Sequence, residues 1–256
     1  MQNDATSKPS VGTPSIERVR HELKRRSLTV RDVAKLTPGM LRIHFTSDDL
    51  GDFVSAAPDD HIKVFVPGDN DTIERRDYTP RRFDTAERTL AIDFAVHDAG
   101  PITQWATAAR PGDTLDIGGP RGSAVISGVE RWLLIGDETA LPAIGRRIEE
   151  STSGMQITSI TAVTSAEDEQ SFDTKADLTC LWAHRPLSEA TDASALLALV
   201  KSVDLPTGTF VWVAAEASVT RAIRAYLVEE RGYPLSWIKA SGYWVKGKSD
   251  ATEKFD

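Results

Sequence analysis

The sequence predicts two domains of different class: an N-terminal antiparallel Greek-key β-barrel, followed by a Rossmann-like α/β domain with a mostly parallel sheet. From about Leu28 to Ser127, short alternating or apolar runs are separated by turn signals, which is typical of an antiparallel barrel or sandwich. After Glu130, apolar strands alternate with helical stretches, which indicates βα units around a parallel sheet. A chain of 256 residues is long enough to build two hydrophobic cores.

The first half contains one helix among its strands. The expected strands are "LTVRDVAKL", "MLRIHFTS", "HIKVFVPG", "RTLAIDFAVH" and "DTLDIGG". In "HDAGPITQWATAARPGD", a Gly-Pro pair precedes a helix-compatible segment and a Pro-Gly pair follows it. These are the expected start and stop signals of a short helix.

The second half opens with "RWLLIGDETALPAIGRRIEE", which reads as a buried strand, a tight turn and an amphipathic helix. Further strands are expected at "MQITSITAVTS", "DLTCLWAH" and "TFVWVAAE", and further helices at "DASALLALVKSV" and "SVTRAIRAYLVEERG". We therefore expect a disordered tail at residues 1–16, the barrel at 17–128, the α/β domain at 129–248 and a C-terminal tail at 249–256.

Composition excludes several classes of function. The net charge of -8 and the pI near 5.2 argue against a nucleic-acid partner. Cys180 is the only cysteine, which excludes an internal disulfide, and the five histidines lack metal-ligand spacing. No apolar run approaches the roughly 20 residues of a membrane span, and the N-terminus lacks the apolar core of a signal peptide. We expect a cytoplasmic protein without a protein-bound metal and without membrane insertion.

The stretch "IERRDYTPRRFD" collects four arginines around one Tyr-Thr pair. On a strand, Arg76 and Tyr78 share a face, while Pro80 redirects Thr79. In one interpretation, Arg76 pairs with a pyrophosphate, Tyr78 stacks on an isoalloxazine ring, and Thr79 reaches the flavin N5. In the other, the segment is an edge strand that its charges protect from aggregation.

The helix that follows Gly100 is a second candidate for a phosphate site. A helix that starts at Pro101 presents the free amides of Ile102, Thr103 and Gln104, and helix N-termini bind phosphates. The alternative is an ordinary crossover helix with Trp105 in the core.

Taken together and in order, these motifs resemble the siderophore-interacting protein family, which comprises flavin-dependent ferric-siderophore reductases of the ferredoxin reductase superfamily. The motifs are "HIKVFVPG", "RRDYTPR", "DFAVHDAGPITQWATAARPGD", "IGGPRGS", "LIGDETALPAI", "WVAAEASVTRAIRAYLVEERG" and "IKASGYW". The resemblance runs from about Val19 to Gly247, which is nearly the whole chain.

The resemblance implies a bound FAD. The implied FAD contacts are Arg76, Tyr78, Thr79, Arg81, His97, Gly100, Pro101, Ile102, Thr103 and Trp105. Among them, Arg81 is expected near the phosphates or the ribityl chain, and Trp105 anchors the helix.

The family also holds its anionic ferric substrate with basic residues near the flavin edge. The corresponding candidates here are Lys63, Arg121 and Lys239, with Lys246 and Lys248 as outer candidates. For Lys63 and Lys239 the alternative is a strand-end lysine without a ligand.

The first turn of the second domain, "LIGDETALPAI", keeps only Gly136 of a Gly-rich phosphate loop. We expect a pyridine-nucleotide half that binds in a modified way, with Asp137 capping the following helix. Glu216 is expected to neighbour the nicotinamide, and Ala215 stands where relatives often have glycine. Arg185, at the end of a strand, would contact a 2'-phosphate and favour NADPH over NADH, or it is simply solvated.

These expectations describe an FAD enzyme that passes electrons from NADPH or NADH to a ferric siderophore, acting as a monomer. No catalytic acid, base or nucleophile is required of the protein. A ferredoxin donor is possible, but ferredoxins are typically acidic and a chain of the same sign would repel one. The alternatives are a flavin reductase for another acceptor and a siderophore carrier that has lost its flavin.

Overall fold

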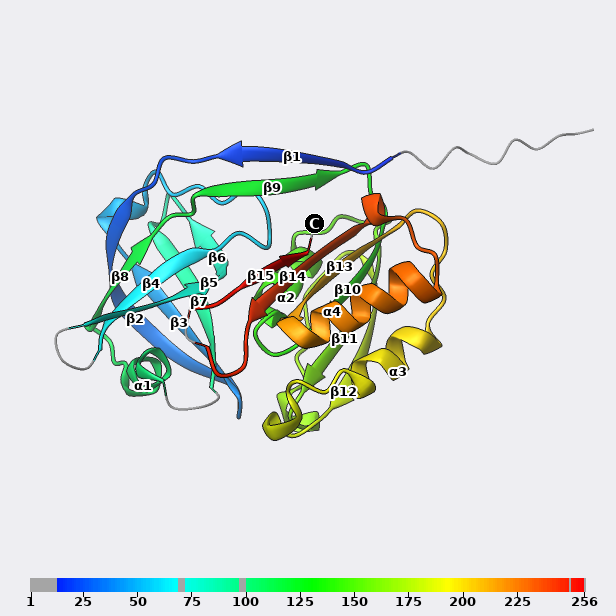
Figure 1. Ribbon diagram of the computed structural model, residues 1–256. Coiled ribbons are helices and arrows are strands. Elements are labelled where there is room, and N and C mark those ends of the chain that lie inside the picture. Colours follow the sequence, from blue (N-terminus) through cyan, green and yellow to red (C-terminus); the bar gives the residue numbers. More distant parts are fainter. Residues whose placement is uncertain (1–12, 69–71, 97–99, 249, 256) are drawn as a thin grey trace, which may run out of the picture.

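The computed structural model describes residues 13–68, 72–96, 100–248 and 250–255, which form two domains that lie side by side (Figure 1). The confirmed fold class is an antiparallel β-barrel domain followed by an α/β domain with a mostly parallel sheet. Strand β1 begins at Ser15, inside the stretch 1–16 that was expected to be a tail, and residues 1–12 of that stretch lie outside the described residues.

The barrel domain is one seven-stranded antiparallel sheet with the strand order β5-β4-β8-β2-β3-β7-β6. Its strands are β2 (Arg25–Thr37), β3 (Met40–Thr46), β4 (Ile62–Pro67), β5 (Ile73–Tyr78), β6 (Pro80–Asp84), β7 (Thr89–Ala95) and β8 (Thr114–Gly118), with a short 3-10 helix η1 at Asp48–Leu50. The two edge strands, β5 and β6, follow each other in the chain and are separated only by Thr79. The sheet therefore curls until its edges meet at this residue.

Alternation along the strands builds the barrel core. In β4, Ile62, Val64 and Val66 are buried, while the residues between them are only half-buried. The single helix α1 (Pro101–Ala108) packs Ile102 and Ala106 into the same core. The helix that the Gly-Pro and Pro-Gly signals predict is therefore present, and its N-terminus lies beside β5.

A two-stranded ribbon of β1 (Ser15–Arg20) and β9 (Gly122–Ser127) leads out of the barrel toward the second domain. Gly122 permits this pairing, because a Cβ atom there would lie 2.5 Å from the Val19 carbonyl oxygen. The chain enters the second domain after Gly128, close to the expected boundary.

The second domain is a six-stranded sheet with the order β12-β11-β10-β13-β14-β15, parallel except for the last pair. Its strands are β10 (Arg131–Gly136), β11 (Gln156–Val163), β12 (Asp177–His184), β13 (Thr209–Glu216), β14 (Ile238–Trp244) and β15 (Glu253–Phe255). Its helices are α2 (Leu141–Glu149), α3 (Ser194–Ser202) and α4 (Ala217–Ala225), the π-helical turn η5 (Tyr226–Glu230), and the 3-10 turns η3 (Ala166–Asp168), η4 (Leu187–Glu189) and η6 (Leu235–Trp237). Instead of a plain C-terminal tail, residues 253–255 add the edge strand β15.

The helices cover both faces of this sheet. Residues of α2 pack against one face with Trp132 and Phe210, whereas residues of α3 and α4 pack against the other with Val211 and Val213. Every residue of β13 is buried, as expected for a central strand of a doubly covered parallel sheet. Among the helices of the described residues, none is long and apolar enough to cross a membrane.

Candidate flavin and substrate site

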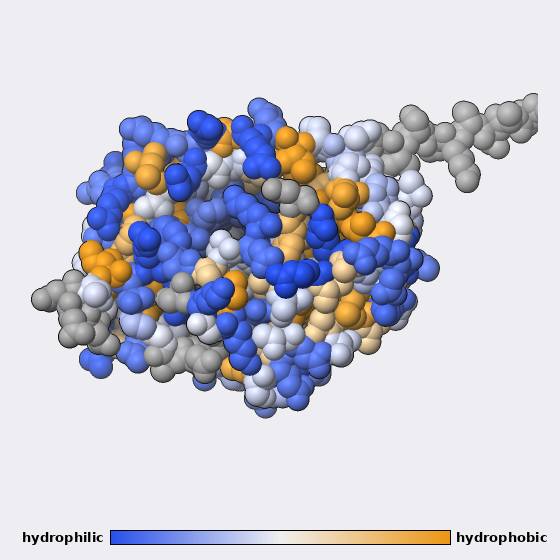
Figure 2. Space-filling model, in the orientation of Figure 1, coloured by the Kyte–Doolittle hydropathy of each residue, from blue (hydrophilic) through white to orange (hydrophobic). Residues whose placement is uncertain are grey.

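The arginine-rich stretch lies where the two domains meet. Strands β5 and β6 carry it, and α2 of the second domain contacts β6. A hollow lies near the middle of the face shown in Figure 2, with hydrophilic residues around much of its rim. The two halves of the stretch have different surroundings.

Arg76, in the first half, lies against the N-terminus of α1. A Cβ atom added to Gly100 would lie 3.0 Å from Arg76 Nη2, so the guanidinium group lies close to the helix N-cap residue. No side chain caps this helix end, and in the described parts of the chain no carboxylate pairs with Arg76. A guanidinium group beside uncapped helix amides is a strong anion-binding arrangement.

Tyr78 lies on the same face of β5 as Arg76, two residues further along. Its ring packs on Phe94 with a centroid distance of 4.7 Å, and Trp105 of α1 packs on Phe94 and Phe45. Burial raises the pKa of Tyr78 to about 12, although the charge of Arg76 opposes this shift. The phenol therefore stays neutral at physiological pH.

These residues fit a flavin dinucleotide. The fit rests on the uncapped helix amides, on the guanidinium of Arg76, which has no carboxylate partner among the described residues, and on the partly exposed ring of Tyr78. The buried Thr79 follows at the turn. They supply phosphate binding and an aromatic surface within one short segment. His97, also predicted to contact FAD, lies outside the described residues.

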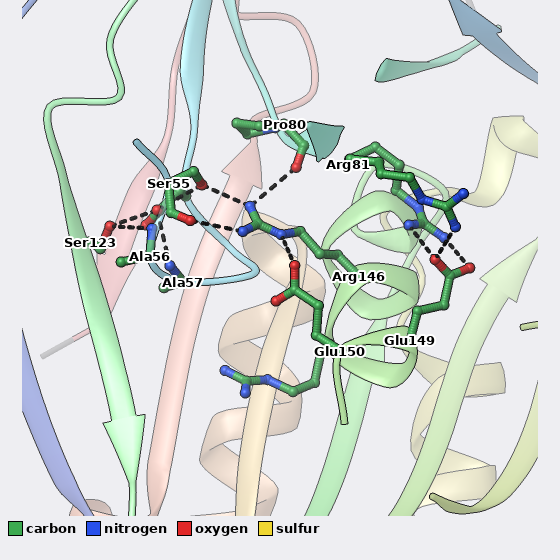
Figure 3. Close-up of polar contacts among 12 residues, drawn as sticks. Ser55, Ala56, Ala57, Pro80, Arg81, Ser123, Arg146, Glu149 and Glu150 are labelled. Atoms are coloured by element: carbon green, nitrogen blue, oxygen red, sulfur yellow. Dashed lines mark hydrogen bonds and ion pairs between the residues drawn. The ribbon is translucent and has the colours of Figure 1, made fainter. Parts of the chain in front are cut away.

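Arg81, in the second half, has a different role from the predicted phosphate contact. Its side chain is 3% exposed, and its two terminal nitrogens donate to Glu149 of α2 at 2.9 and 2.6 Å (Figure 3). Arg82 donates to the same carboxylate at 2.8 Å. Both terminal nitrogens of Arg81 bind Glu149, and its Nε lies 3.6 Å from Asp93. This residue therefore joins the two domains.

Arg146 of α2 makes a second connection to the barrel. Its guanidinium group donates to Ser55 Oγ and the Ser55 carbonyl oxygen at 2.7 and 2.9 Å, and to the Pro80 carbonyl oxygen at 3.2 Å (Figure 3). Pro80 directly follows Thr79, so α2 holds the turn on which Thr79 lies. The sequence signal for this connection was only the charged run "RRIEE" on an otherwise apolar helix.

Asp137 organises the turn after β10. Asp137 Oδ1 accepts from Thr139, and Oδ2 accepts from the Glu216 amide and from Trp244 Nε1, both at 2.9 Å. The expected capping of α2 by Asp137 is wrong, because the N-cap residue of that helix is Ala140 and has no side-chain cap. Asp137 instead ties the ends of β10, β13 and β14 together.

Glu216 caps α4. Its carboxylate accepts from Ser218 and from the Lys246 amide. Burial raises the pKa of Glu216, but these hydrogen bonds outweigh burial and leave the pKa below its ordinary value. The carboxylate is therefore ionised at the carboxyl end of β13, the edge of the sheet where ligands of open α/β folds bind.

Arg185 does not have the exposed position expected for a 2'-phosphate contact. It is 6% exposed and donates two hydrogen bonds to Glu138, at 2.9 and 2.8 Å. Burial raises the pKa of Glu138 and the charge of Asp137 adds to this shift, whereas Arg185 opposes it. The pair leaves no free guanidinium group for a phosphate.

The basic side chains that were predicted to bind the anionic substrate differ in how far protein carboxylates already occupy them. Lys63 Nζ lies 3.1 Å from Asp77 and 2.5 Å from Asp250, and Lys239 Nζ lies 2.5 Å from Asp59. Arg121 is exposed, and its side chain has no ion-pair partner in the described ranges. Of the outer candidates, Lys246 donates to the Ser188 carbonyl oxygen, and Lys248 is exposed.

Comparisons with known proteins bear on the whole chain. Residues 129–247 match the model of the siderophore-interacting protein family, and residues 29–75 and 67–124 match the siderophore-interacting FAD-binding domain. The NADPH-dependent ferric-chelate reductase of Escherichia coli (strain K12) is 31% identical over 251 residues, covering 89% of this chain and 96% of the relative. This chain belongs to the siderophore-interacting protein family.

Solved structures of the siderophore-interacting family agree with the fold. A siderophore utilization protein from T. fusca has a TM-score of 0.84 at 34% identity and covers 93% of this chain and 98% of its own. The siderophore-interacting protein SipS from Aeromonas hydrophila has a TM-score of 0.76 at 26% identity and covers 90% and 94%. The predicted family is confirmed, and the residues that match the FAD-binding domain lie in the barrel domain.

Proposed function

We propose that this protein is an FAD-dependent ferric-siderophore reductase that takes its electrons from NADPH. The observation that carries the proposal is the arrangement of Arg76, Tyr78 and the uncapped N-terminus of α1 at the edge of the barrel. The barrel matches an FAD-binding domain, and the E. coli relative is named an NADPH-dependent ferric-chelate reductase. A second relative, from Vibrio cholerae, is named ferric vibriobactin reductase.

In this proposal, the barrel residues hold the cofactor. Arg76 and the amides of Ile102 and Thr103 bind the pyrophosphate, Tyr78 packs on the flat ring, and Thr79 lies at the ring's polar edge. When bound, FAD supplies the conversion of a two-electron donor into one-electron reduction of Fe(III). The chain supplies binding and orientation, so no side chain is needed as a general acid or nucleophile.

The ferric siderophore is the substrate. Fe(III) is a hard ion held by oxygen ligands, and Fe(II) is held less tightly by the same ligands, so reduction releases the metal. Lys63, Arg121 and Lys239 are proposed to attract the anionic complex. We propose that the protein acts as a monomer in the cytoplasm, where the released iron is used.

The second domain is proposed to bind the nicotinamide nucleotide at the carboxyl ends of its strands, close to Glu216. Because Glu138 engages Arg185 and Asp137 fills the turn after β10, the nucleotide phosphates are not expected at the N-terminus of α2. This arrangement predicts weaker nucleotide binding than a Gly-rich phosphate loop provides.

The test is an anaerobic titration of the FAD-loaded protein with NADPH while the visible spectrum is recorded. The proposal expects the flavin bands to bleach, and to recover when a ferric siderophore is added with formation of Fe(II). If the bands persist with NADPH but bleach with a reduced ferredoxin, the electron donor is a ferredoxin instead of NADPH. If the bands bleach with NADPH but recover only when a quinone or free flavin is added, the electron acceptor is that compound instead of a ferric siderophore.

A further inference from the structure

The segment after β14 places a carboxylate on two cations of the barrel. Asp250 Oδ1 lies 2.5 Å from Lys63 Nζ, and Oδ2 lies 3.1 Å from Arg75 Nε. Figure 1 shows this segment, in red, returning toward the barrel before it enters β15. The C-terminal segment therefore contacts the same lysine that is proposed to attract the substrate.

Asp250 lies on a short tether that is anchored on both sides. Before it, Val245 and Lys248 form a β-bridge. After it, β15 pairs with β14, and Glu253 accepts from Arg221 at 2.6 and 2.7 Å. A group on so short a tether keeps a high effective concentration near its partner even when the contact breaks.

The cluster of Lys63, Arg75, Asp77 and Asp250 has no net charge, because two cations face two carboxylates. Asp77 belongs to β5 and is fixed in the sheet opposite Lys63. Asp250 belongs to no strand, and its backbone has a φ of 50°, a left-handed conformation that a non-glycine residue adopts at a cost. Of the two carboxylates, Asp250 is the one that a ligand can displace.

We propose that Asp250 is a specificity-determining residue that competes with anionic ferric complexes for Lys63 and Arg75. While Asp250 is bound, the cluster attracts no anion, and when an anionic complex displaces it the cluster carries a net charge of one positive unit. A neutral complex gains nothing from this exchange. The inference rests on the proposed function, since it assigns the regulation of the same substrate site.

The experiment compares the wild-type holoenzyme with Asp250→Asn and measures binding of two gallium complexes. Ga(III) has the charge of Fe(III) but is not reduced under these conditions, so binding is measured without turnover. The probes are an anionic tris-catecholate complex and a neutral trihydroxamate complex. We expect Asp250→Asn to lower the Kd of the catecholate complex about fivefold, a change that shrinks at high salt, and to leave the hydroxamate complex unchanged.

Two further variants separate competition from a general charge effect. Glu229→Gln removes an exposed carboxylate beyond α4, so it changes the net charge equally and is expected to leave both Kd values unchanged. In a Lys63→Ala background, the effect of Asp250→Asn is expected to fall below twofold, because only Arg75 of the two contested cations is left. An undiminished effect in that background would overturn the proposal.

A third measurement is independent of any ferric ligand. Limited modification with an amine-reactive reagent, followed by peptide mass spectrometry, reports how far Asp250 masks Lys63. We expect Lys63 to react faster in Asp250→Asn than in the wild type and Glu229→Gln. Equal reactivity overturns the inference even if the protein reduces ferric siderophores. Faster reaction without binding of either gallium complex by any variant overturns the proposed function, and with it the role of Asp250.

Discussion

The two halves of "IERRDYTPRRFD" contain the same residue types but have opposite surroundings. Before Thr79, Arg76 is half-buried, faces an uncapped helix end and has no carboxylate partner among the residues of the described structure. After Thr79, Arg81 is buried and binds Glu149 of the other domain. The comparison shows that identical side chains in one short stretch serve a ligand or the domain interface according to the carboxylates that the fold brings to them.

The largest expected effect is on stability, in the second half of the stretch. Arg81→Ala takes the buried partner away from Glu149, which keeps only the exposed Arg82, whereas Asp93 keeps Arg42. We therefore expect the free energy of unfolding to fall by about 3 kcal/mol. Thermal or urea unfolding of the holoprotein measures this change. Arg82→Ala is the matched control, because its side chain is 69% exposed and bonds the same carboxylate, and it should cost below about 1 kcal/mol. Equal losses in both variants would refute the assigned role of Arg81.

In the first half, the expected effect is on the cofactor. Removal of Arg76 takes away one partner of a charge-assisted contact, which typically costs about 2 kcal/mol, or thirty-fold in affinity. Arg76→Ala should therefore lose FAD on dialysis while its unfolding transition without FAD is nearly unchanged. Arg75→Ala serves as the control, since Arg75 is exposed and bonds Asp250. Full flavin occupancy in Arg76→Ala would remove this residue from the cofactor site.

A pH experiment sharpens the contrast further. Burial raises the pKa of Glu149, but the hydrogen bonds from Arg81 and Arg82 outweigh it and leave the pKa below its ordinary value. A carboxylate with a lowered pKa stabilises the fold above its unfolded-state pKa and loses that contribution as the pH falls through the folded value. We therefore expect wild-type stability to fall below a pH of about 4, and Glu149→Gln to fall less steeply there. If the free energy of unfolding falls equally steeply with decreasing pH in the wild type and in Glu149→Gln, Glu149 does not contribute to the pH dependence of stability.

The smallest expected effect concerns the outward face of the β4–β5 hairpin, opposite Arg76. Lys63→Ala should leave FAD bound and raise the KM for an anionic ferric complex about twofold to threefold, because Asp250 already occupies this cation for part of the time. Lys35→Ala, at an exposed position of β2, removes an equal charge away from the hairpin. Steady-state kinetics compare the two, and an unchanged KM in Lys63→Ala would exclude the residue from substrate attraction.

Much of the fold was predictable because its signals are local. Alternation in "HIKVFVPG" and the continuous apolar run "TFVWVAAE" distinguish a half-exposed barrel strand from a doubly covered parallel strand. The Gly-Pro signal correctly located α1. The edge strand β15 was not predicted, because three residues in a polar tail carry no periodicity and pair only when β14 is already in place.

The site was predictable in part. The face shared by Arg76 and Tyr78, and their proximity to the helix that begins at Pro101, follow from strand alternation and from the order of the motifs. The roles expected of Arg81 and Arg185 did not appear, because Glu149 and Glu138 reach them from segments distant in sequence. A single sequence does not show which carboxylate will face a given arginine.

By itself, the sequence determined the two domain classes, the family, and the positions of the arginine-rich strand and of the helix that begins at Pro101. These depend on periodicity, turn residues and the order of motifs, all of which are properties of neighbouring residues. Only the tertiary structure decided which cations remain free for ligands. Arg81 and Arg185 are each paired with a carboxylate that folding brings from elsewhere in the chain. Lys63 and Lys239 also meet such carboxylates, with which an anionic substrate would have to compete.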